Sequence, residues 1–478
     1  MRRHTIGYLA IIGISILLIG VLLHFGERDM PSPSTAASAA HATTVGTSLD
    51  LFITSLKANF HHPVAILFLQ ITIILIAARL AGALFTYFGQ PAVIGEVIAG
   101  IVLGPSLLGG IFPSFLTTCF PPDSLPRLQL FSQFGLVLFM FIIGMELNLD
   151  TVRKKAAAAV MISHVGIVAP FLLGVGASIG LFRYYASPTV GFTAFALFMG
   201  VAMSITAFPV LARIINERGL SASPLGSLVL TCAAADDITA WCLLAAVVAY
   251  VKMGTAVQTI YLLIALGLFA LIMIRVVRPV IARWGEKFSE SNPPGRNAMA
   301  VIFSLLFISA FFTDLVGIHA LFGGFLMGAI MPEGAVRLLI MEKIRDLSML
   351  VLLPIFFMIS GLRTQFGLLN SGTDWLFCAL IIFVAIAGKF GGTLFAARFA
   401  GQSWRDSSVI GVLMNTRGLV ELIVLNIGYE MHILEPRIFS MMVIMALVTT
   451  CIAGPYLSLL DWYEKKRLRS GVVNPVTS

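Results

Sequence analysis

Two neighbouring carboxylates, Asp236 and Asp237, lie near the middle of an apolar run that extends from about residue 225 to residue 250. The run is long enough to cross a bilayer as a helix. A charge at the centre of a spanning helix costs about 2.5 to 3.5 kcal/mol, so an adjacent pair at this depth predicts a function. A purely structural polar cluster is the alternative interpretation.

The two carboxylates should have different roles, because adjacent side chains on a helix point about 100° apart. A carboxylate held away from water can exchange a proton for a metal cation. We expect the pair to titrate as a coupled unit. The chemistry that these residues predict is therefore reversible binding of a cation or a proton.

Lys389 is the expected charge partner, since it is a lone ammonium within the apolar segment 374–399. Charges at membrane depth pair with one another or face a wet cavity. The glycines around Lys389 permit close helix approach. The alternative is that its long side chain extends to the inner membrane interface.

The apolar segment 190–215 contains a polar interruption with Ser204, Thr206 and Pro209. Proline removes a backbone donor and frees carbonyl groups. For this segment alone, a simple proline kink is the alternative to a binding site.

The segment 407–428 contains a second interruption, with Asn415, Thr416, Arg417 and Glu421. Interrupted helices at corresponding places in two halves predict a transporter site, because irregular backbone at this depth is tolerated only against protein or water. Arg417 and Glu421 are spaced i, i+4 and could pair with each other, which favours a structural role over direct ion handling.

The composition shows what kind of elements must position these residues. Of the 478 residues, 58% are hydrophobic and only 11% are charged, which is typical of a polytopic helical membrane protein and excludes a soluble globular domain. The net charge of +8 comes from basic residues scattered through short loops, so we do not expect a nucleic-acid partner.

Thirteen apolar segments follow one another from His62 to Leu460. We predict helices at about 63–87, 91–109, 129–148, 156–182, 190–215, 222–251, 257–277, 297–313, 319–332, 343–362, 374–399, 407–428 and 437–460.

The distribution of basic residues predicts the topology, with the amino terminus on the cytoplasmic side. Of the 31 lysines and arginines, 21 fall in the segments assigned to the inside and 7 in those assigned to the outside. The remaining three, Arg79, Lys389 and Arg417, lie within helices. This bias agrees with the positive-inside rule.

The two ends of the chain are predicted to lie outside this bundle. A charged start and an apolar core up to about His24 are typical of a signal sequence, and we favour a retained anchor over cleavage. Residues 29–47 are predicted to form an exposed linker. The short tail at 461–478 is expected to be cytoplasmic and leaves no room for a regulatory nucleotide-binding domain. The five cysteines show no paired spacing, so neither disulfides nor a cysteine metal site is expected.

Several motifs in a fixed order resemble the second family of monovalent cation:proton antiporters, which includes bacterial sodium/proton exchangers, potassium-efflux systems and plant cation/proton exchangers. They are SITAFPVLAR at 204–213, Ala235-Asp236-Asp237 with Trp241, the stretch from Gly317 to Gly323, Gly388-Lys389, and NTRGLVELIVLNIG at 415–428.

The resemblance implies a thirteen-helix antiporter fold with inverted repeats and two crossing interrupted helices. It implies a dimerisation domain, a mobile ion-translocating core and a linker helix, which we assign to 63–148 with 297–362, to 156–251 with 374–460, and to 257–283. Residues 1–62 would form the anchor helix and linker, which depart from the usual family plan.

The resemblance also implies roles for single residues. Asp237 would bind Na⁺ or K⁺ and protons, and Asp236 would pair with Lys389. Ser204 and Thr206, with nearby backbone carbonyls, would contribute to an oxygen cage of the kind that hard cations prefer. Accessory or structural roles are left for Pro209, Asn415, Thr416, Arg417 and Glu421.

We therefore expect a homodimeric antiporter of a bacterial inner membrane, without enzymatic activity or cofactor. It would exchange a cation, with Na⁺ favoured and Li⁺ possible, for protons by alternating access, and the exchange would be electrogenic. Potassium/proton exchange is the alternative within the family. A passive cation channel is the alternative of another class, since it also uses intramembrane charges but needs no proton coupling.

Overall fold

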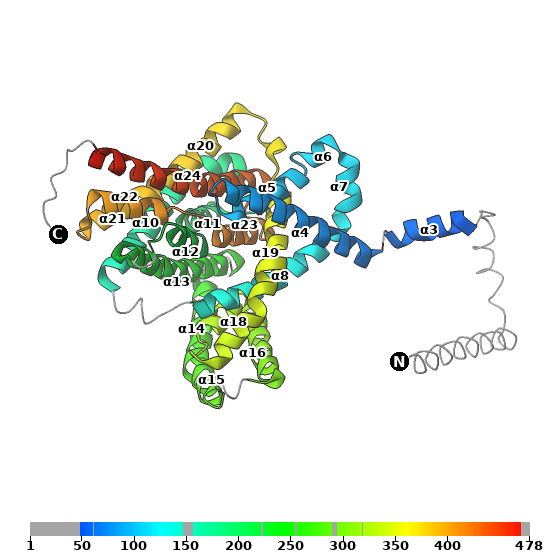
Figure 1. Ribbon diagram of the computed structural model, residues 1–478, viewed down its shortest axis with the longest axis horizontal. Helices are drawn as coiled ribbons and strands as arrows, with labels where there is room; N and C mark the ends of the chain where they lie inside the picture. Colours follow the sequence, from blue (N-terminus) through cyan, green and yellow to red (C-terminus); the bar gives the residue numbers. More distant parts are fainter. Residues whose placement is uncertain are drawn as a thin grey trace. The chain divides into compact units, whose positions relative to one another are not determined.

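The computed structural model describes residues 48–60, 62–146, 156–220, 223–253, 256–288, 294–317 and 319–469 (Figure 1). The predicted leader up to His24, the linker at 29–47 and the end of the predicted tail at 470–478 lie outside these residues. Within the described ranges all regular elements are helical, and the one isolated β-bridge joins Ala186 and Leu434. The predicted all-α class is confirmed.

Ten helical stretches among the described residues are long and apolar enough to cross a membrane. The protein is an integral membrane protein, as its composition predicts. Its main helices are α4 (Pro63–Tyr87), α5 (Ala92–Leu103), α8 (Leu125–Glu146), α10 (Ala156–Tyr185), α11 (Phe192–Ser204), α12 (Phe208–Glu217), α13 (Pro224–Met253), α14 (Ala256–Ile272), α15 (Arg278–Gly285), α16 (Arg296–Leu315), α17 (Ala320–Ala329), α18 (Ala335–Leu347), α19 (Leu353–Arg363), α20 (Gly372–Ile386), α21 (Gly392–Phe399), α22 (Trp404–Met414), α23 (Leu419–Glu430) and α24 (Pro436–Arg469).

Each of the thirteen predicted segments contains a helix or a run of consecutive helices. Three segments are not among the ten long apolar stretches. The segments 190–215 and 407–428 are each divided into two short helices, and 319–332 holds only the ten residues of α17. That these three also cross the membrane stays a prediction.

The predicted boundaries at the two ends need correction. α24 runs to Arg469, because the charged residues that follow its apolar part are good helix formers, so the tail predicted from 461 begins as helix. Near the other end, Ser48–Phe60 form helix α3 where only an anchor and a linker were predicted. The chain divides into the units Met1–Ala65 and Ile66–Ser478, and the polar interruptions and the intramembrane charges lie in the second.

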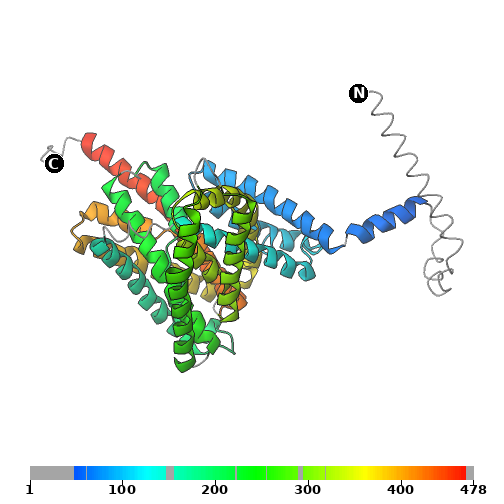
Figure 2. The same ribbon diagram turned by 90° about the horizontal axis from the view of Figure 1, so that it is seen from below.

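Two groups of helices pack mainly within themselves. In the first group α17 packs against α8 and α16, and α19 packs against α5 and α8. In the second group α10 packs against α11, α13, α20 and α21. In the same group α12 packs against α13, α22 against α21, and α24 against α20 and α23. The helices α14 and α16 lie alongside each other (Figure 2). The rings of Phe269 in α14 and Phe312 in α16 stack with their centroids 4.3 Å apart.

Small residues set the close helix contacts of the first group. A Cβ atom on Gly328 in α17 would lie 2.1 Å from Phe141 O and 2.9 Å from the Cα of Gly144 in α8. On Gly361 in α19, it would lie 2.7 Å from the Cα of Gly100 in α5. Glycine at these positions lets the backbones meet directly, which is how helices associate when the surrounding solvent is lipid.

Candidate functional site

The polar interruption at 204–209 ends one helix and begins another. α11 stops at Ser204, Ile205 is extended, and α12 begins at Phe208. Pro209 is the second residue of α12, where a backbone N–H has no partner within the helix. The proline therefore starts a half-helix, and the simple kink considered for this segment is wrong.

The interruption in 407–428 divides that segment in the same way. α22 ends at Met414, and Asn415 forms its C-cap. α23 begins at Leu419, after Gly418. Asn415 is buried, and its Oδ1 has no hydrogen-bond partner among the described residues. The sequence therefore predicts both broken helices correctly.

The two breaks lie against each other. The backbone N–H of Ala207 donates to Thr416 O at 3.0 Å. The hydroxyl of Thr206 donates to Met414 O, also at 3.0 Å. Each break thus supplies hydrogen bonds that the other has lost by unwinding, which backbone in an apolar surrounding requires.

Two buried, positively charged side chains bind the carboxyl end of α11. Arg417 donates to Ala202 O at 3.1 Å and to Met203 O at 2.6 Å, and Lys389 donates to Ser204 O. The last carbonyls of a helix lack partners within it and carry the negative end of its dipole. Arg417 and Lys389 are both fully buried, so they satisfy these carbonyls where water cannot.

Asp236 and Lys389 form the predicted ion pair. Nζ of Lys389 lies 2.8 Å from Oδ2 of Asp236, and both side chains are fully buried. Lys389 lies in a π-helical turn at Ala387–Gly391, a deviation that often marks functional sites. Ser163 donates to the other oxygen, Oδ1 of Asp236, at 3.5 Å. The alternative that Lys389 extends to the interface is therefore wrong.

Asp237 differs from its neighbour, as the helical angle between them predicts. Its side chain is also fully buried, but neither carboxylate oxygen has a hydrogen-bond partner among the described residues. An isolated ionised carboxylate in an apolar surrounding is very costly, so this group requires a proton or a cation. The geometry makes Asp237 the candidate ligand and leaves Asp236 as the partner of Lys389.

The two hydroxyl groups expected in the oxygen cage lie at the end of α11 and in its break. Ser204 Oγ donates to Gly200 O at 2.7 Å and to Ile167 O at 3.0 Å. Thr206 donates to Met414 O as described. Both hydroxyl protons are committed to backbone carbonyls, and their lone pairs remain able to contact a cation.

Arg417 and Glu421 pair with each other, as their spacing predicts, with Nη1 and Oε1 3.2 Å apart. Glu421 stands in the first turn of α23, where the helix dipole favours a negative charge. Thr416 contributes its backbone oxygen to the crossing, while its hydroxyl donates to Leu413 O at 2.7 Å. These residues hold the crossing together.

Two hydroxyl residues of the site were missed from the sequence. Ser163 contacts Asp236, and Thr450 accepts from the Arg417 N–H at 3.0 Å while donating to Arg417 O at 2.6 Å. Their only sequence signal is a single hydroxyl within an apolar segment. That signal is weak, because serine and threonine in such helices commonly bond to their own backbone.

A family model described as "Sodium/hydrogen exchanger, transmembrane" matches residues 71–460. The "Na(+)/H(+) antiporter NhaS4" of Synechocystis sp. is 42% identical over 388 residues, which cover 81% of this chain and 95% of that protein.

Other relatives are longer than this chain. Identity is 37% to "Cation/H(+) antiporter 15" of Arabidopsis thaliana and 35% to "K(+)/H(+) antiporter 1" of Saccharomyces cerevisiae, over 91% and 88% of this chain. The matches span about half of these relatives, 52% and 49%. Among solved structures, the sodium proton antiporter MjNhaP1 of Methanocaldococcus jannaschii has a TM-score of 0.55 at 12% identity, covering 84% of this chain and 98% of that one, which shows a shared fold.

Proposed function

Because this chain belongs to the sodium/hydrogen exchanger family, we propose that it exchanges a monovalent cation for protons across a membrane by alternating access. The observation that carries the proposal is Asp237, a buried carboxylate whose two oxygens have no hydrogen-bond partner among the described residues. Its neighbour Asp236 pairs with Lys389, which donates to Ser204 O at the first helix break. Asp237 binds either a cation or a proton, so one competes with the other and exchange becomes obligatory.

The oxygen atoms around the crossing would complete the cation site. Hard cations prefer oxygen ligands. Candidates are Thr206 Oγ1, the hydroxyl of Ser204, and the unpartnered Oδ1 of Asn415. The last of these is supported by the same kind of observation as Asp237, because it is a buried acceptor that receives no hydrogen bond from the described residues.

Asp236 and Lys389 would couple proton movement to charge. Their pair releases or takes up a proton when Asp237 changes its occupant, so more protons than cations move per cycle and exchange is electrogenic. The close contact of 2.8 Å and complete burial support this coupling. Transport in proteoliposomes that does not respond to an imposed voltage would remove it.

The two helix groups would be the moving parts. The group containing α5, α8, α16, α17 and α19 forms a dimerisation domain, and the group containing α10 to α13 and α20 to α24 carries the ion site past it. The linker helix 257–283 joins them. We further propose a homodimer in a bacterial inner membrane with both termini cytoplasmic, in agreement with the positive-inside distribution.

Na⁺ is the favoured cation, because the Synechocystis relative, 95% of which is covered by the match, is named a Na⁺/H⁺ antiporter. K⁺ is the second candidate, since a K⁺/H⁺ antiporter is 35% identical. A passive channel is disfavoured, because the matching family model and the relatives are described as exchangers and antiporters rather than channels.

Reconstitution tests the function directly. A pH gradient is imposed on proteoliposomes, and Na⁺, Li⁺ or K⁺ is added in turn, with the voltage clamped by an ionophore or left free. Collapse of the gradient by one ion identifies the substrate. No collapse by any of the three ions, under conditions where each ion still crosses passively, favours the channel.

A further inference from the structure

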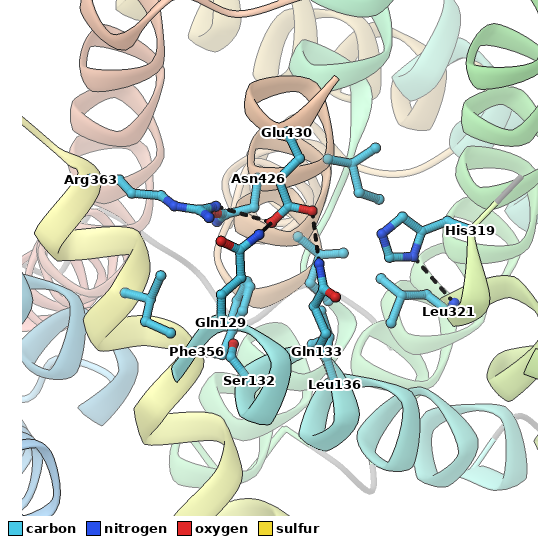
Figure 3. A pocket seen from close by; sticks show the side chains of 13 residues that line it. Gln129, Ser132, Gln133, Leu136, His319, Leu321, Phe356, Arg363, Asn426 and Glu430 are labelled. Carbon is cyan, nitrogen blue, oxygen red and sulfur yellow. Dashed lines mark hydrogen bonds and ion pairs between the residues drawn. The ribbon is translucent and has the colours of Figure 1, made fainter. Parts of the chain in front are cut away.

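Glu430, the last residue of α23, lies in a polar cluster outside the ion site (Figure 3). Its Oε1 accepts from Gln129 Nε2 at 2.7 Å and from Arg363 Nη1 at 3.2 Å, and its Oε2 accepts from Gln133 Nε2 at 3.0 Å. Gln129 and Gln133 are one turn apart on α8, so both amides reach the same carboxylate. Three donors from two helices therefore hold this one side chain.

The same face of α23 makes further contacts with α19. Arg363 donates to Asn426 Oδ1 at 2.6 Å, and its guanidinium lies 5.0 Å from the ring centre of Tyr429. Asn426 donates to Ser360 Oγ at 2.7 Å. Asn426, Tyr429 and Glu430 are spaced to share one side of the helix. The cluster therefore joins α8 and α19, of the first helix group, to α23, of the second.

The cluster leaves little free space. The pocket among these residues has a volume of about 20 Å³, and His319, Ile423 and Ile427 also line it. That volume has room for about one water molecule and no hydrated ion. Arg363 and Glu430 retain only 15% and 24% of their side-chain exposure, so the contact closes the gap between the two groups at this place.

The ends of α23 connect this cluster to the ion site. The helix begins at Leu419, next to the crossing, and ends at Glu430. At 1.5 Å per residue its ends are about 16 Å apart. Arg363 is one of the seven basic residues that the predicted topology assigns to the outer side of the membrane. The cluster thus lies between the crossing and the outer face.

We propose that Glu430, with Gln129, Gln133 and Arg363, is the outer gate contact of the exchanger. The cluster holds α23 against α8 and α19 while the ion site is closed to the outer side, and it breaks when the site opens there. Glu430 is a positioning residue that acts through α23. The inference rests on the proposed exchange function, because only a carrier needs this contact to break in each cycle.

Sided labelling tests the gate. Ile427→Cys, at a buried position lining the pocket, is placed in a background without the five native cysteines, and a membrane-impermeant maleimide is applied to one face at a time. Adding Glu430→Gln should speed labelling from the outer face about tenfold, because the closed state loses charged contacts. Labelling from the inner face should not become faster.

Asp374→Asn is the matched control. Asp374 contacts Arg437 at 3.7 Å and Tyr185 at 2.8 Å, so it also pairs a carboxylate with a cation, but within the second helix group. It should leave labelling unchanged. The pair Gln129→Leu with Gln133→Leu removes the same contact from the α8 side and should act like Glu430→Gln, which covers the case that the first variant does not fold.

A kinetic measurement separates gating from general damage. Opening the outer gate raises the fraction of protein that can bind from outside, so the KM for cation on that side should fall by up to the same tenfold factor while the maximal rate falls. The gate proposal is overturned if Glu430→Gln does not accelerate labelling from the outer face or accelerates it equally from both faces. It is also overturned if Asp374→Asn accelerates labelling as much as Glu430→Gln does. Labelling does not need transport, so failure of the exchange function would appear separately, in the reconstituted fluxes.

Discussion

The carboxylates of Asp237 and Glu430 are bound in opposite ways. Asp237 is fully buried with neither oxygen bound by a described protein donor, whereas both oxygens of Glu430 are filled by Gln129, Gln133 and Arg363. A ligand site must keep its lone pairs available, while a structural contact must use them. The difference separates the carboxylate proposed to bind the ion from one that binds other side chains of the protein.

Cations near the crossing explain how Asp237 stays unpaired. Lys389 is held by Asp236 and Ser204 O, and Arg417 by Glu421 and the last turn of α11. Both positive charges are thus committed elsewhere. Among the described residues, the charges of Asp236, Lys389, Arg417 and Glu421 are thus paired, whereas neither oxygen of Asp237 has a hydrogen-bond partner. We propose that the transported ion or a proton neutralises Asp237.

Of the substitutions that test this difference between the carboxylates, Asp237→Asn should have the largest effect on exchange. An amide cannot exchange a proton or neutralise a cation, so exchange should fall to the level of protein-free liposomes. Thermal stability in detergent should change little, because the Asp237 side chain makes no hydrogen bond to the described residues that the substitution could remove. Asp314→Asn, at an exposed carboxylate, should keep full exchange. Proton-coupled flux that persists in Asp237→Asn would falsify the assignment.

Lys389→Gln should mainly damage the framework. Removing one partner of a buried ion pair costs about 3 to 5 kcal/mol, because Asp236 is left as a buried charge that keeps the 3.5 Å hydrogen bond from Ser163 but loses its cation. The double variant Asp236→Asn with Lys389→Gln should recover much of that stability, and it should carry fewer protons per cation. Unfolding temperature and the voltage dependence of transport measure the two effects. A double variant as unstable as the single one would contradict the pairing.

The pH dependence should follow competition at Asp237. A bound proton excludes the cation, so the KM for cation should fall as pH rises until the carboxylate is fully ionised. On the acid side of that titration the KM should change about tenfold per pH unit. Initial rates over a range of cation concentrations at each pH measure it. A constant KM with a changing maximal rate would place the pH effect outside the site.

Thr206→Val should have the smallest effect. It removes the hydroxyl that donates to Met414 O and one oxygen near the cation, at a cost of about 1 kcal/mol, or roughly a fivefold rise in KM. Thr206→Ser keeps the hydroxyl and should stay close to the original value. Equal KM values in the valine and serine variants would show that the hydroxyl does not contribute.

Much of the fold follows from local sequence. Apolar length predicts the helices, because a spanning helix needs a fixed number of apolar residues. The pairing of Asp236 with Lys389 is predictable too, since a lone buried charge must find another. The breaks at 204–209 and 414–421 are visible as polar interruptions, and the family model over 71–460 confirms the resemblance.

Other features depend on tertiary packing and leave no local signal. Gln129 and Glu430 are 301 positions apart, and each is an ordinary polar residue near a helix end. The i, i+4 spacing already gives Arg417 a partner in Glu421. The sequence therefore does not indicate that Arg417 also donates to Ala202 O and Met203 O. Such contacts follow from how the helices are placed, which periodicity does not determine.

The crossing also constrains how the protein is made. The break around Thr206 obtains its hydrogen bonds from residues near Met414, which are 208 positions later in the chain. A backbone N–H or C=O group without a hydrogen-bond partner in the hydrocarbon core costs free energy. During synthesis, the first broken helix must therefore remain in a wet or shielded surrounding, such as the insertion machinery, until the second arrives. The crossing, which we propose as the transport site, is consequently among the last parts of the protein to form. A nascent chain that ends before residue 414 cannot make the Thr206–Met414 hydrogen bond.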